Sequence, residues 1–308
     1  MSRRKGGGLR HILECAGLLL VACALRVLPS SLAYRAGGAL GLGAFRVDRR
    51  HRNVTLENIR MAYHGKLGEE DVAALGREVF RHLGWTVVDI CRLHRITPRT
   101  VSRYITVEGY DNVERIQAQG RGVIFAPLHL GCWEVLPIAT ALRGSPAASL
   151  ARPLDNPYLD FLLNRLRTRW GGEVVSKRNA LPELLKILRR AGSVAILIDQ
   201  NVAREEGVFV EFFGRPACTT VTPVLLALRT GAALVPVAAV RAGRERHRIV
   251  VSPEVPLVKS GDLTQDLQVN TGALSRVLEE IIRQNPEQWF WVHRRWKTRP
   301  PPPTPMVP

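Results

Sequence analysis

The sequence predicts an α/β fold in which a mixed, mostly parallel sheet is covered by helices, with membrane-associated helices at the N-terminus. From residue 120 onward, short apolar runs alternate with stretches of helical periodicity, which is typical of buried parallel strands joined by helices. Before residue 50, a basic segment leads into two weakly apolar stretches. The 308 residues are ample for a sizeable core.

Short apolar runs, most of them rich in β-branched residues, predict the strands. They cover residues 122–126, 147–151, 193–198, 234–238 and, as the weakest of the set, 248–251. Helical spacing predicts a helix over about residues 69–93, with one apolar stripe made of Val72, Leu75, Val79, Leu83 and Val87. Further helices are expected at 159–170, 181–190, 221–230 and 263–282. The proline-rich tail, residues 300–308, is expected to be extended.

The N-terminus carries four basic residues and no acid within residues 2–10. An apolar run of eleven residues, 15–25, follows, and a glycine-rich stretch, 31–45, is broken by Arg35. Eleven helical residues reach only about 16 Å, well short of the ~30 Å hydrocarbon core of a bilayer. We therefore predict helices that lie in the membrane interface. A secretory signal peptide and an ordinary amphipathic core helix are the alternatives, and Glu14 within the segment argues against the signal peptide.

The charge balance is strongly basic. The chain has 44 Lys and Arg against 27 Asp and Glu, a formal net charge of +17. Such an excess favours anionic partners: an anionic membrane surface, an acidic protein or a nucleic acid. Because the basic residues are spread along the chain without a recognised binding motif, a nucleic-acid-binding protein is a distant alternative and no nucleic acid is expected.

The five cysteines are scattered and contain no Cys-x-x-Cys pair. This pattern indicates neither a disulfide framework nor a zinc site, and no metal is expected. A serine or cysteine hydrolase is a further alternative, but the sequence lacks a G-x-S-x-G motif. We interpret Cys132 as a small wall residue, since nothing nearby in the sequence marks it as an activated thiolate.

The string His129-Leu130-Gly131-Cys132-Trp133-Glu134 directly follows the strand predicted at 122–126. Open α/β sheets bind ligands at the carboxyl ends of their strands. On a continuous helix His129 and Glu134 would lie ~140° apart, so they share a site only if a turn at Gly131 lets them converge. Glu134 would then bind one imidazole nitrogen and leave the other free as a general base. A structural histidine with satisfied hydrogen bonds is the alternative.

Further blocks follow in the same order as in a known family. They are Arg152-Pro153-x-Asp155-Asn156-Pro157-x-x-Asp160, Asp199-Gln200-Asn201, Gly207-Val208-Phe209-Val210-x-Phe212-Phe213-Gly214, Gly231-Ala232 with Pro236, and Glu287-Gln288-Trp289-x-Trp291-x-His293-Arg294-Arg295-Trp296-Lys297. With His129 and Glu134, which match a His-x4-Asp/Glu motif, the chain resembles the bacterial lipid A late acyltransferases of the lauroyl/myristoyl type. These belong to the wider lysophospholipid and glycerol-phosphate acyltransferases. The resemblance covers roughly residues 105–300, with a similar segment at Asn53-x-x-x-Glu57-Asn58. Position 132 departs from it, being Cys where the family usually has Asn.

The resemblance implies a glycerol-phosphate acyltransferase-like fold and transfer of a fatty acyl group to a hydroxyl of a glucosamine-based lipid, a lipid A precursor. It implies an acyl carrier protein thioester as donor and no cofactor. His129 is expected to deprotonate the hydroxyl, with Glu134 holding the imidazole tautomer. The expected place is the cytoplasmic face of the inner membrane. The nearest alternative acceptor is a glycerophospholipid or a phosphatidylinositol mannoside.

Substrate-binding roles are expected for six further residues, each with a structural alternative: Arg152, Asp199, Gln200, Phe209, Phe212 and Phe213. Arg152 either stabilises the thioester oxyanion, grips an acceptor phosphate or pairs with Asp155 or Asp160. Asp199 and Gln200 are expected chiefly to organise a loop over 201–214. The phenylalanines form either core or the wall of an acyl pocket.

The C-terminal tryptophans and basic residues suit either a membrane interface or a basic surface with buried Trp. The predicted organisation is therefore 1–50 for the basic N-terminus and membrane-associated helices, 51–299 for the acyltransferase domain and 300–308 for the tail.

Overall fold

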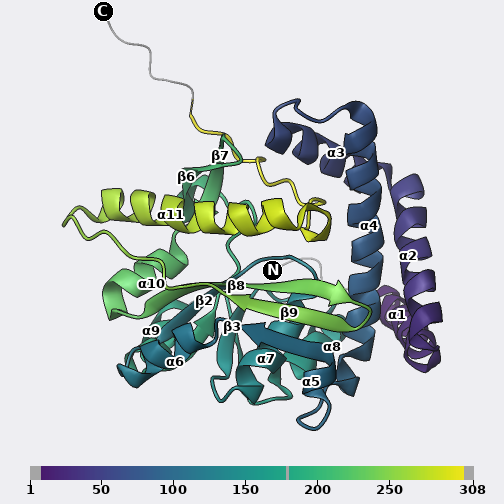
Figure 1. Ribbon diagram of the computed structural model, residues 1–308, viewed down its shortest axis with the longest axis horizontal. Coiled ribbons are helices and arrows are strands. Elements are labelled where there is room, and N and C mark those ends of the chain that lie inside the picture. Colours follow the sequence, from purple (N-terminus) through teal and green to yellow (C-terminus); the bar gives the residue numbers. More distant parts are fainter. Residues whose placement is uncertain (1–7, 178–179, 302–308) are drawn as a thin grey trace, which may run out of the picture.

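A computed structural model describes residues 8–177 and 180–301, and its centre is a seven-stranded sheet (Figure 1). The strands are β1 (Ile105–Glu108), β2 (Val123–Pro127), β3 (Ala147–Ala151), β4 (Glu173–Ser176), β5 (Ser193–Ala195), β8 (Ala233–Gly243) and β9 (Arg246–Val251). They lie in the order β1-β9-β8-β2-β5-β3-β4. Within this described sheet, neighbours pair in parallel except β8 with β9, which are antiparallel. The predicted mixed, mostly parallel sheet is confirmed.

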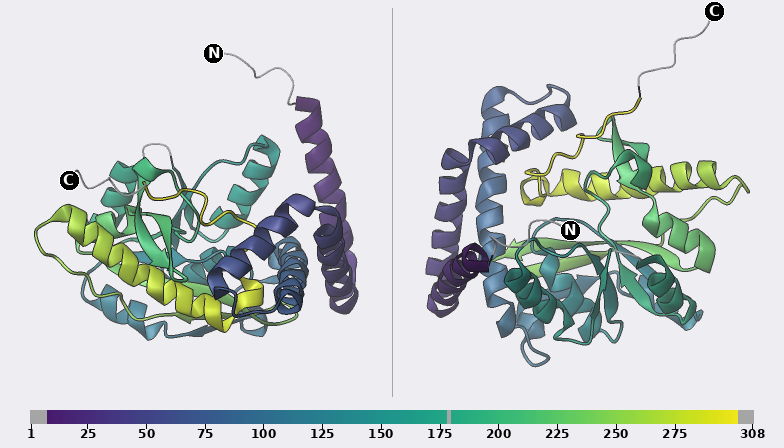
Figure 2. Two further views of the ribbon diagram at one scale, coloured as in Figure 1. Left: turned by 90° about the horizontal axis from the view of Figure 1, so that it is seen from above. Right: turned by 180° about the vertical axis from the view of Figure 1, so that it is seen from behind.

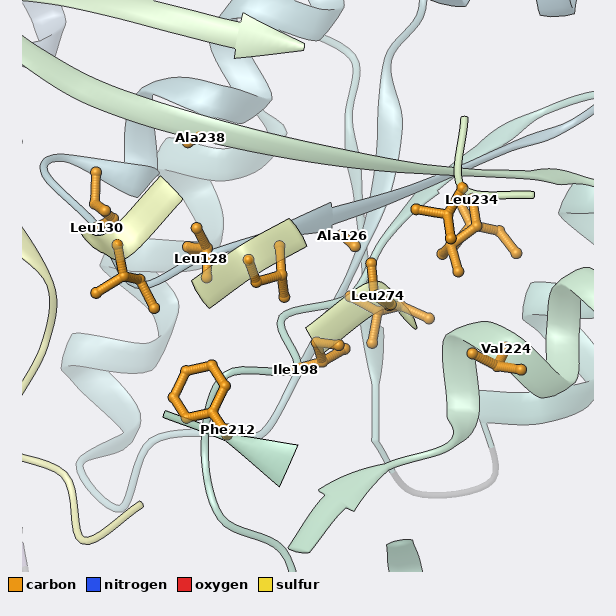
Figure 3. Close-up of a cluster of buried hydrophobic side chains, with 14 of the residues drawn as sticks. Ala126, Leu128, Leu130, Ile198, Phe212, Val224, Leu234, Ala238 and Leu274 are labelled. Atoms are coloured by element: carbon orange, nitrogen blue, oxygen red, sulfur yellow. The ribbon is translucent and has the colours of Figure 1, made fainter. Parts of the chain in front are cut away.

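Helices cover both faces of the sheet, so each face has its own apolar core. One core receives side chains from α9 (Ala180–Arg189), α10 (Thr222–Thr230) and α11 (Leu263–Gln284). The other receives them from α5 (Val101–Tyr104), α6 (Asp111–Ala118), α7 (Leu136–Leu142) and α8 (Pro157–Thr168). Successive side chains of β2 pack into opposite cores: Ile124 packs into the first and Phe125 into the second. Figure 3 shows part of the first core, with Leu128, Phe212 and Leu274.

The structure adds elements that the sequence patterns did not predict. Strands β1 and β4 and helices α6 and α7 are among them, as is α3 (Arg49–Tyr63). The expected loop over 201–214 is wrong in its second half, because β6 (Gly207–Phe212) pairs with β7 (Arg215–Thr220) as a separate two-stranded hairpin. Single turns of 3-10 helix complete the described chain: η1 (Leu93–Arg95), η2 (Trp133–Val135), η3 (Arg204–Glu206) and η4 (Pro286–Gln288).

Three N-terminal helices stand at one end of the sheet beside α3 (Figures 1 and 2). They are α1 (Gly8–Val27), α2 (Ser30–Val47) and α4 (Glu69–Arg92). The glycines of α2 serve close helix packing, since a Cβ at Gly41 would come within 2.0 Å of the backbone oxygen of Phe80 on α4. The stripe predicted for α4 is wrong at Val87, which is 48% exposed. Val88 is buried in its place, because this end of the helix packs against Leu25 and Tyr34.

A buried ionic clamp fastens the N-terminal helices to the sheet. The guanidinium of Arg92 donates to the backbone oxygens of Leu25 at 2.7 Å and Leu28 at 2.9 Å, and also to Glu245 in the β8–β9 turn. Ser30 donates to the same carboxylate at 2.8 Å. A buried cation needs such partners, since an unpaired one would be strongly destabilising. The helices before residue 50 are therefore built into the fold.

Within the described residues, no helix is both long enough and apolar enough to cross a membrane. Large apolar side chains are nevertheless exposed along α1 and α2, namely Ile12, Leu13, Leu18, Leu19, Leu20, Val21, Val27, Leu32, Leu40 and Val47. Soluble proteins rarely expose so many apolar side chains together. The interfacial role of these helices stays a prediction. Residues 302–308 of the expected proline-rich tail, and the basic residues Arg3, Arg4 and Lys5, lie outside the described residues.

Candidate active site

The predicted site residues gather at the carboxyl edge of the sheet. His129 comes two residues after β2, Arg152 directly follows β3, and Asp199 follows the β5 segment. The strands β2, β5 and β3 are parallel neighbours, so these chain ends emerge on the same side. The strand expected at 193–198 ends at Ala195, although the backbone N–H of Ile196 still donates to Phe125. The next residues lead out of the sheet to the site.

Gly131 shapes the loop that presents His129. Its φ is +59°, and a Cβ at this position would come within 2.1 Å of the backbone oxygen of Ala239. Only glycine adopts this conformation at such close range without strain. The loop is held on both sides by backbone hydrogen bonds, from Gly131 to Gln288 at 3.0 Å and from Phe290 to His129 at 3.0 Å. The block at 287–297 thus fixes the backbone around His129.

Asp199 is the partner of His129. The Nδ1–H of His129 donates to Asp199 Oδ1 at 2.7 Å, and the backbone N–H of His129 donates to Oδ2 at 2.8 Å. Trp289 Nε1 donates to Oδ2 as well, at 2.8 Å. The Asp199 side chain is only 1% exposed. Burial raises its pKa, but His129 and the hydrogen bonds from His129 and Trp289 together outweigh burial and hold the pKa below the usual value. Asp199 is therefore a carboxylate that fixes the imidazole tautomer.

The other imidazole nitrogen faces the cavity. The side-chain amide of Gln200 lies 3.3 Å from Nε2 of His129. With Nδ1 as the donor to Asp199, Nε2 carries a lone pair. The rings of Trp133 and Phe290 flank the imidazole, with centroids 5.1 and 6.0 Å from it. This arrangement orients a single basic nitrogen toward the space where a ligand would lie.

The expected hydrogen bond between Glu134 and His129 is wrong. Both oxygens of Glu134 accept from Arg167 on α8, at 2.8 and 2.5 Å, and the Glu134 side chain is 5% exposed. The turn at Gly131 leads into η2, where Glu134 points toward α8 instead of back to the histidine. Burial lowers the pKa of Arg167, yet Glu134 raises it by more, so its pKa lies above the usual value. The buried Glu134 and the half-buried Arg167 form an ion pair.

A cavity of about 540 Å³ joins these groups. Its volume is within the range of ~300–1,000 Å³ that is typical of small-molecule sites. His129, Glu134, Arg167 and Gln200 line it, as does His293, whose Nε2 accepts from the backbone of Asn201 at 2.9 Å. Burial lowers the pKa of His293 to about 4 against the opposing charge of Asp199, so His293 is neutral near pH 7.

The part of the cavity between the sheet and α7 has an apolar lining, and we call it the apolar channel. Phe125, Ala147, Ala195 and Val237 form its sheet side, and all belong to the core face that α7 covers or pack against it. Leu136 is among the α7 residues opposite them. Ala147 and Ala195 on neighbouring strands leave this part of the sheet surface open. The site therefore combines one basic nitrogen with an apolar space.

Arg152 lies at the mouth of the cavity. Its side chain is 81% exposed, and its guanidinium is 3.8 Å from Asp155, which is also exposed. An exposed pair at this distance contributes little to stability. The pairing with Asp160 does not form, since Asp160 accepts from Leu154 and Asn164.

The predicted phenylalanines belong to the core and hairpin, and the lining of the described cavity does not include them. Phe212 and Phe213 are fully buried and pack against Trp289 and Trp291. Phe209 lies in β6 with partial burial. Of the two interpretations, core packing is therefore the one observed.

The C-terminal aromatic block is also core. Trp289 and Trp291 are buried, and the backbone oxygens of Trp291 and His293 each accept from Asn58 at 2.7 Å. Arg295 is 1% exposed and donates to the backbone of Cys218 at 2.8 Å. A membrane interface built from Trp289 and Trp291 is wrong, because their rings are buried, whereas Trp296 is half-buried and packs against the first core.

Cys132 is unsuited to nucleophilic catalysis. It is completely buried, and burial raises the pKa of its thiol well above the usual value. The thiol therefore stays protonated near neutral pH. Within residues 8–177 and 180–301, no three His, Cys, Asp or Glu side chains are grouped so that they would hold a metal ion.

Sequence reasoning missed three residues of the site: Arg167, Trp289 as a donor to Asp199, and His293. Trp289 and His293 lie within a block that the family resemblance had marked, so this signal was available. Arg167 had no such signal, since it is one of two arginines on an amphipathic helix.

Comparison with known proteins agrees with the geometry. Residues 9–298 match the family model of the bacterial lipid A biosynthesis acyltransferases. The chain is 27% identical over 278 residues to the lipid A biosynthesis lauroyltransferase of Escherichia coli K12, covering 89% of this chain and 88% of that protein. It is 28% identical over 275 residues to the palmitoleoyltransferase of the same organism, covering 89% and 87%.

The lipid A biosynthesis myristoyltransferase of Escherichia coli K12 is 23% identical over 265 residues, covering 85% of this chain and 80% of that protein. The names of these three relatives differ in the acyl group. The family match extends over almost the whole chain, from the first N-terminal helix to the C-terminal aromatic block. This protein therefore belongs to the bacterial lipid A biosynthesis acyltransferase family, and it is an acyltransferase of lipid A and lipopolysaccharide biosynthesis.

Proposed function

We propose that this protein transfers a fatty acyl group from acyl carrier protein to a hydroxyl of a glucosamine-based lipid A precursor, with His129 as general base. The observation that carries this is the basic Nε2 of His129, which faces a cavity with an apolar channel while Asp199 occupies Nδ1. A hydroxyl needs a base near neutral pKa to attack a thioester.

In the proposed reaction the acceptor hydroxyl gives its proton to Nε2 as its oxygen attacks the thioester carbonyl carbon. An oxygen–carbon bond forms, and the tetrahedral intermediate breaks its carbon–sulfur bond. The protonated His129 returns the proton to the leaving thiolate. The side-chain amide of Gln200 lies 3.3 Å from Nε2, and in the proposed reaction it leaves this nitrogen to the acceptor hydroxyl and donates to the oxyanion of the intermediate instead. No covalent acyl-enzyme is required.

Asp199 replaces Glu134 as the residue that we propose to orient the base. A buried carboxylate on Nδ1 favours the tautomer with a free Nε2 and stabilises the imidazolium formed during proton transfer. Glu134 remains in the proposal as a positioning residue that holds Arg167 on the cavity wall. The ion pair places a cation where the acceptor or the thioester would lie.

The apolar channel is the proposed place of the acyl chain. Its sheet side is contributed by Phe125, Ala147 and Ala195, and α7 closes the other side. Burial of each CH₂ group contributes about 0.8 kcal/mol. Arg152 at the mouth is exposed enough to grip an anionic group of an arriving substrate, and we assign it this role rather than oxyanion stabilisation.

Net charge supports the proposed acyl donor, and the N-terminal helices support the proposed cellular location. Acyl carrier proteins are acidic, and a net charge of +17 attracts them over long range. The exposed apolar side chains of α1 and α2 suit binding to the interface of an anionic membrane. We therefore propose the cytoplasmic face of the inner membrane as the site of action.

Mass spectrometry of lipids from cells with and without this protein tests the proposal. The expected result is a lipid A species heavier by one acyl group when the protein is present, and the loss of that species with His129→Ala. A change confined to glycerophospholipids or phosphatidylinositol mannosides would refute the lipid A acceptor and favour the alternative substrate class.

A further inference from the structure

A second cavity, of about 770 Å³, lies outside the candidate active site. Its walls come from α2, from α4, from the turn between β8 and β9, and from η4. The acyl-transfer chemistry proposed above uses none of these surfaces. They nevertheless enclose a space large enough for a small ligand.

The cavity is strongly cationic. Arg35, Arg81, Arg241 and Arg244 line it, whereas Glu287 is the acid among its described lining residues. Arg81 is paired with Glu78 and Arg241 with Asp89. Arg35 and Arg244 are exposed and make no hydrogen bond or ion pair with any described residue. Two positive charges are thus free to bind an anion.

His82 adds a polar group without a partner. Its Nδ1 is buried and forms no hydrogen bond, and its ring lies 4.6 Å from that of Trp85. Burial, followed by the charges of Arg241 and Arg81, lowers the pKa of His82 to about 4. A neutral imidazole therefore lines the cavity beside Trp85.

The same cavity borders an apolar surface. Ala39 and Leu42 are part of its lining, and Leu32 and Leu40 of the same helix are exposed. A ligand that fits both properties has an anionic head and an apolar tail. We propose that this cavity binds the phosphate group of an anionic lipid, with Arg35 and Arg244 as the residues that bind the phosphate.

The inner wall of this cavity also supports the loop of His129. The guanidinium of Arg241 donates to Thr86 Oγ1 at 3.2 Å, and Thr86 donates to the backbone oxygen of Gly131 at 2.9 Å. Gln288 accepts from the backbone N–H of Arg241 at 2.7 Å through its side chain and from that of Gly131 at 3.0 Å through its backbone. A lipid bound here would therefore rest on the residues that hold the catalytic loop.

The test is a thermal-shift titration of the purified full chain with dihexanoylphosphatidylglycerol, dihexanoylphosphatidylcholine and inorganic phosphate. The phosphatidylglycerol is expected to raise Tm by a few degrees, by linkage of binding to folding, and the other two by clearly less. The double variant Arg35→Gln/Arg244→Gln is expected to lose this shift. Both side chains are exposed and unpartnered, so its Tm without lipid stays unchanged.

The matched control is Arg229→Gln/Arg276→Gln, which removes two exposed arginines on α10 and α11 and is expected to keep the full shift. An equal shift in both double variants would overturn the proposal, as would an equal shift with inorganic phosphate alone. A second readout is the His82 imidazole in an NMR titration, whose pKa is expected to rise when the anionic lipid binds. Because these measurements involve no acyl transfer, their outcome is independent of the proposed function.

Discussion

Asp199 accepts a hydrogen bond from His129 at 2.7 Å, although 70 residues separate them in the chain. Their contact depends on the sheet, because β2 and β5 are parallel neighbours and both chains leave at the same edge. The pair is held by Trp289, which donates to the same carboxylate. This three-residue arrangement is the basis of the mechanistic predictions.

His129→Ala is expected to lower the rate of acyl transfer by about 10²–10⁴-fold, the range for loss of a general base. The Tm is expected to fall by a few degrees at most, because the buried Asp199 carboxylate loses one donor but keeps the backbone N–H of residue 129 and Trp289 Nε1. Radiolabelled acyl transfer and a thermal melt measure the two quantities. A variant with near-normal rate and unchanged Tm would refute the role of His129.

Asp199→Asn is expected to be severely impaired, because an amide on Nδ1 permits the wrong imidazole tautomer. The double variant with His129→Ala is expected to be little worse than the worse single variant, since the two residues act as a unit. Glu134→Gln is the comparison variant, because it weakens the ion pair with Arg167 and leaves the hydrogen bond between His129 and Asp199 in place. Additive losses for His129 and Asp199 would show that they work independently.

Ala195→Leu is expected to shorten the preferred acyl chain, because its added side chain would fill part of the apolar channel. Competition between acyl carrier protein thioesters of different chain length, read by mass spectrometry, measures the preference. The rate with the shortest donor on the same variant is the internal control. A uniform loss with all donors would place the acyl chain elsewhere.

Turnover with the carrier-bound donor is expected to fall steeply as salt rises from low to moderate ionic strength. The attraction between a protein of net charge +17 and an acidic carrier is screened over about 10 Å at 0.1 M salt. The coenzyme A thioester of the same fatty acid is the control. A flat salt profile, or equal rates with both donors, would argue against acyl carrier protein.

The stability of the fold is expected to fall as the pH drops from about 6.5 to about 4. Burial is the main cause that lowers the pKa of His82, His247 and His293 to about 4, against a usual value of 6.5. The unfolded chain therefore binds protons first, and acid shifts the equilibrium toward it. Urea midpoints across this range measure the loss.

The variant His82→Phe isolates one contribution to this pH dependence. It keeps the ring contact with Trp85 and removes a buried atom without a partner. Its stability at pH 7 is expected to match or exceed that of the natural protein, with a shallower acid dependence. An unchanged slope would mean that His82 takes up no proton on unfolding in this range.

The sequence predicted the parallel sheet and the place of His129 because both depend on local pattern. Apolar runs define strands, and the His129 block directly follows one of them. The partner of His129 depends on strand order instead, so the nearby Glu134 was chosen over the distant Asp199. Phe212 and Phe213 show a second limit, since the same residue type lines a channel or fills a core. Burial distinguishes the two, and it is a property of the folded chain.

The clamp between Arg92 and Glu245 has a consequence for how the protein would approach a lipid surface. It ties the outer helices α1 and α2 to the turn between β8 and β9, and so to the sheet. If the exposed apolar side of these helices rests on a bilayer, the mouth of the site is held at one fixed height above it. Substrates drawn from that bilayer would then reach His129 at a single depth.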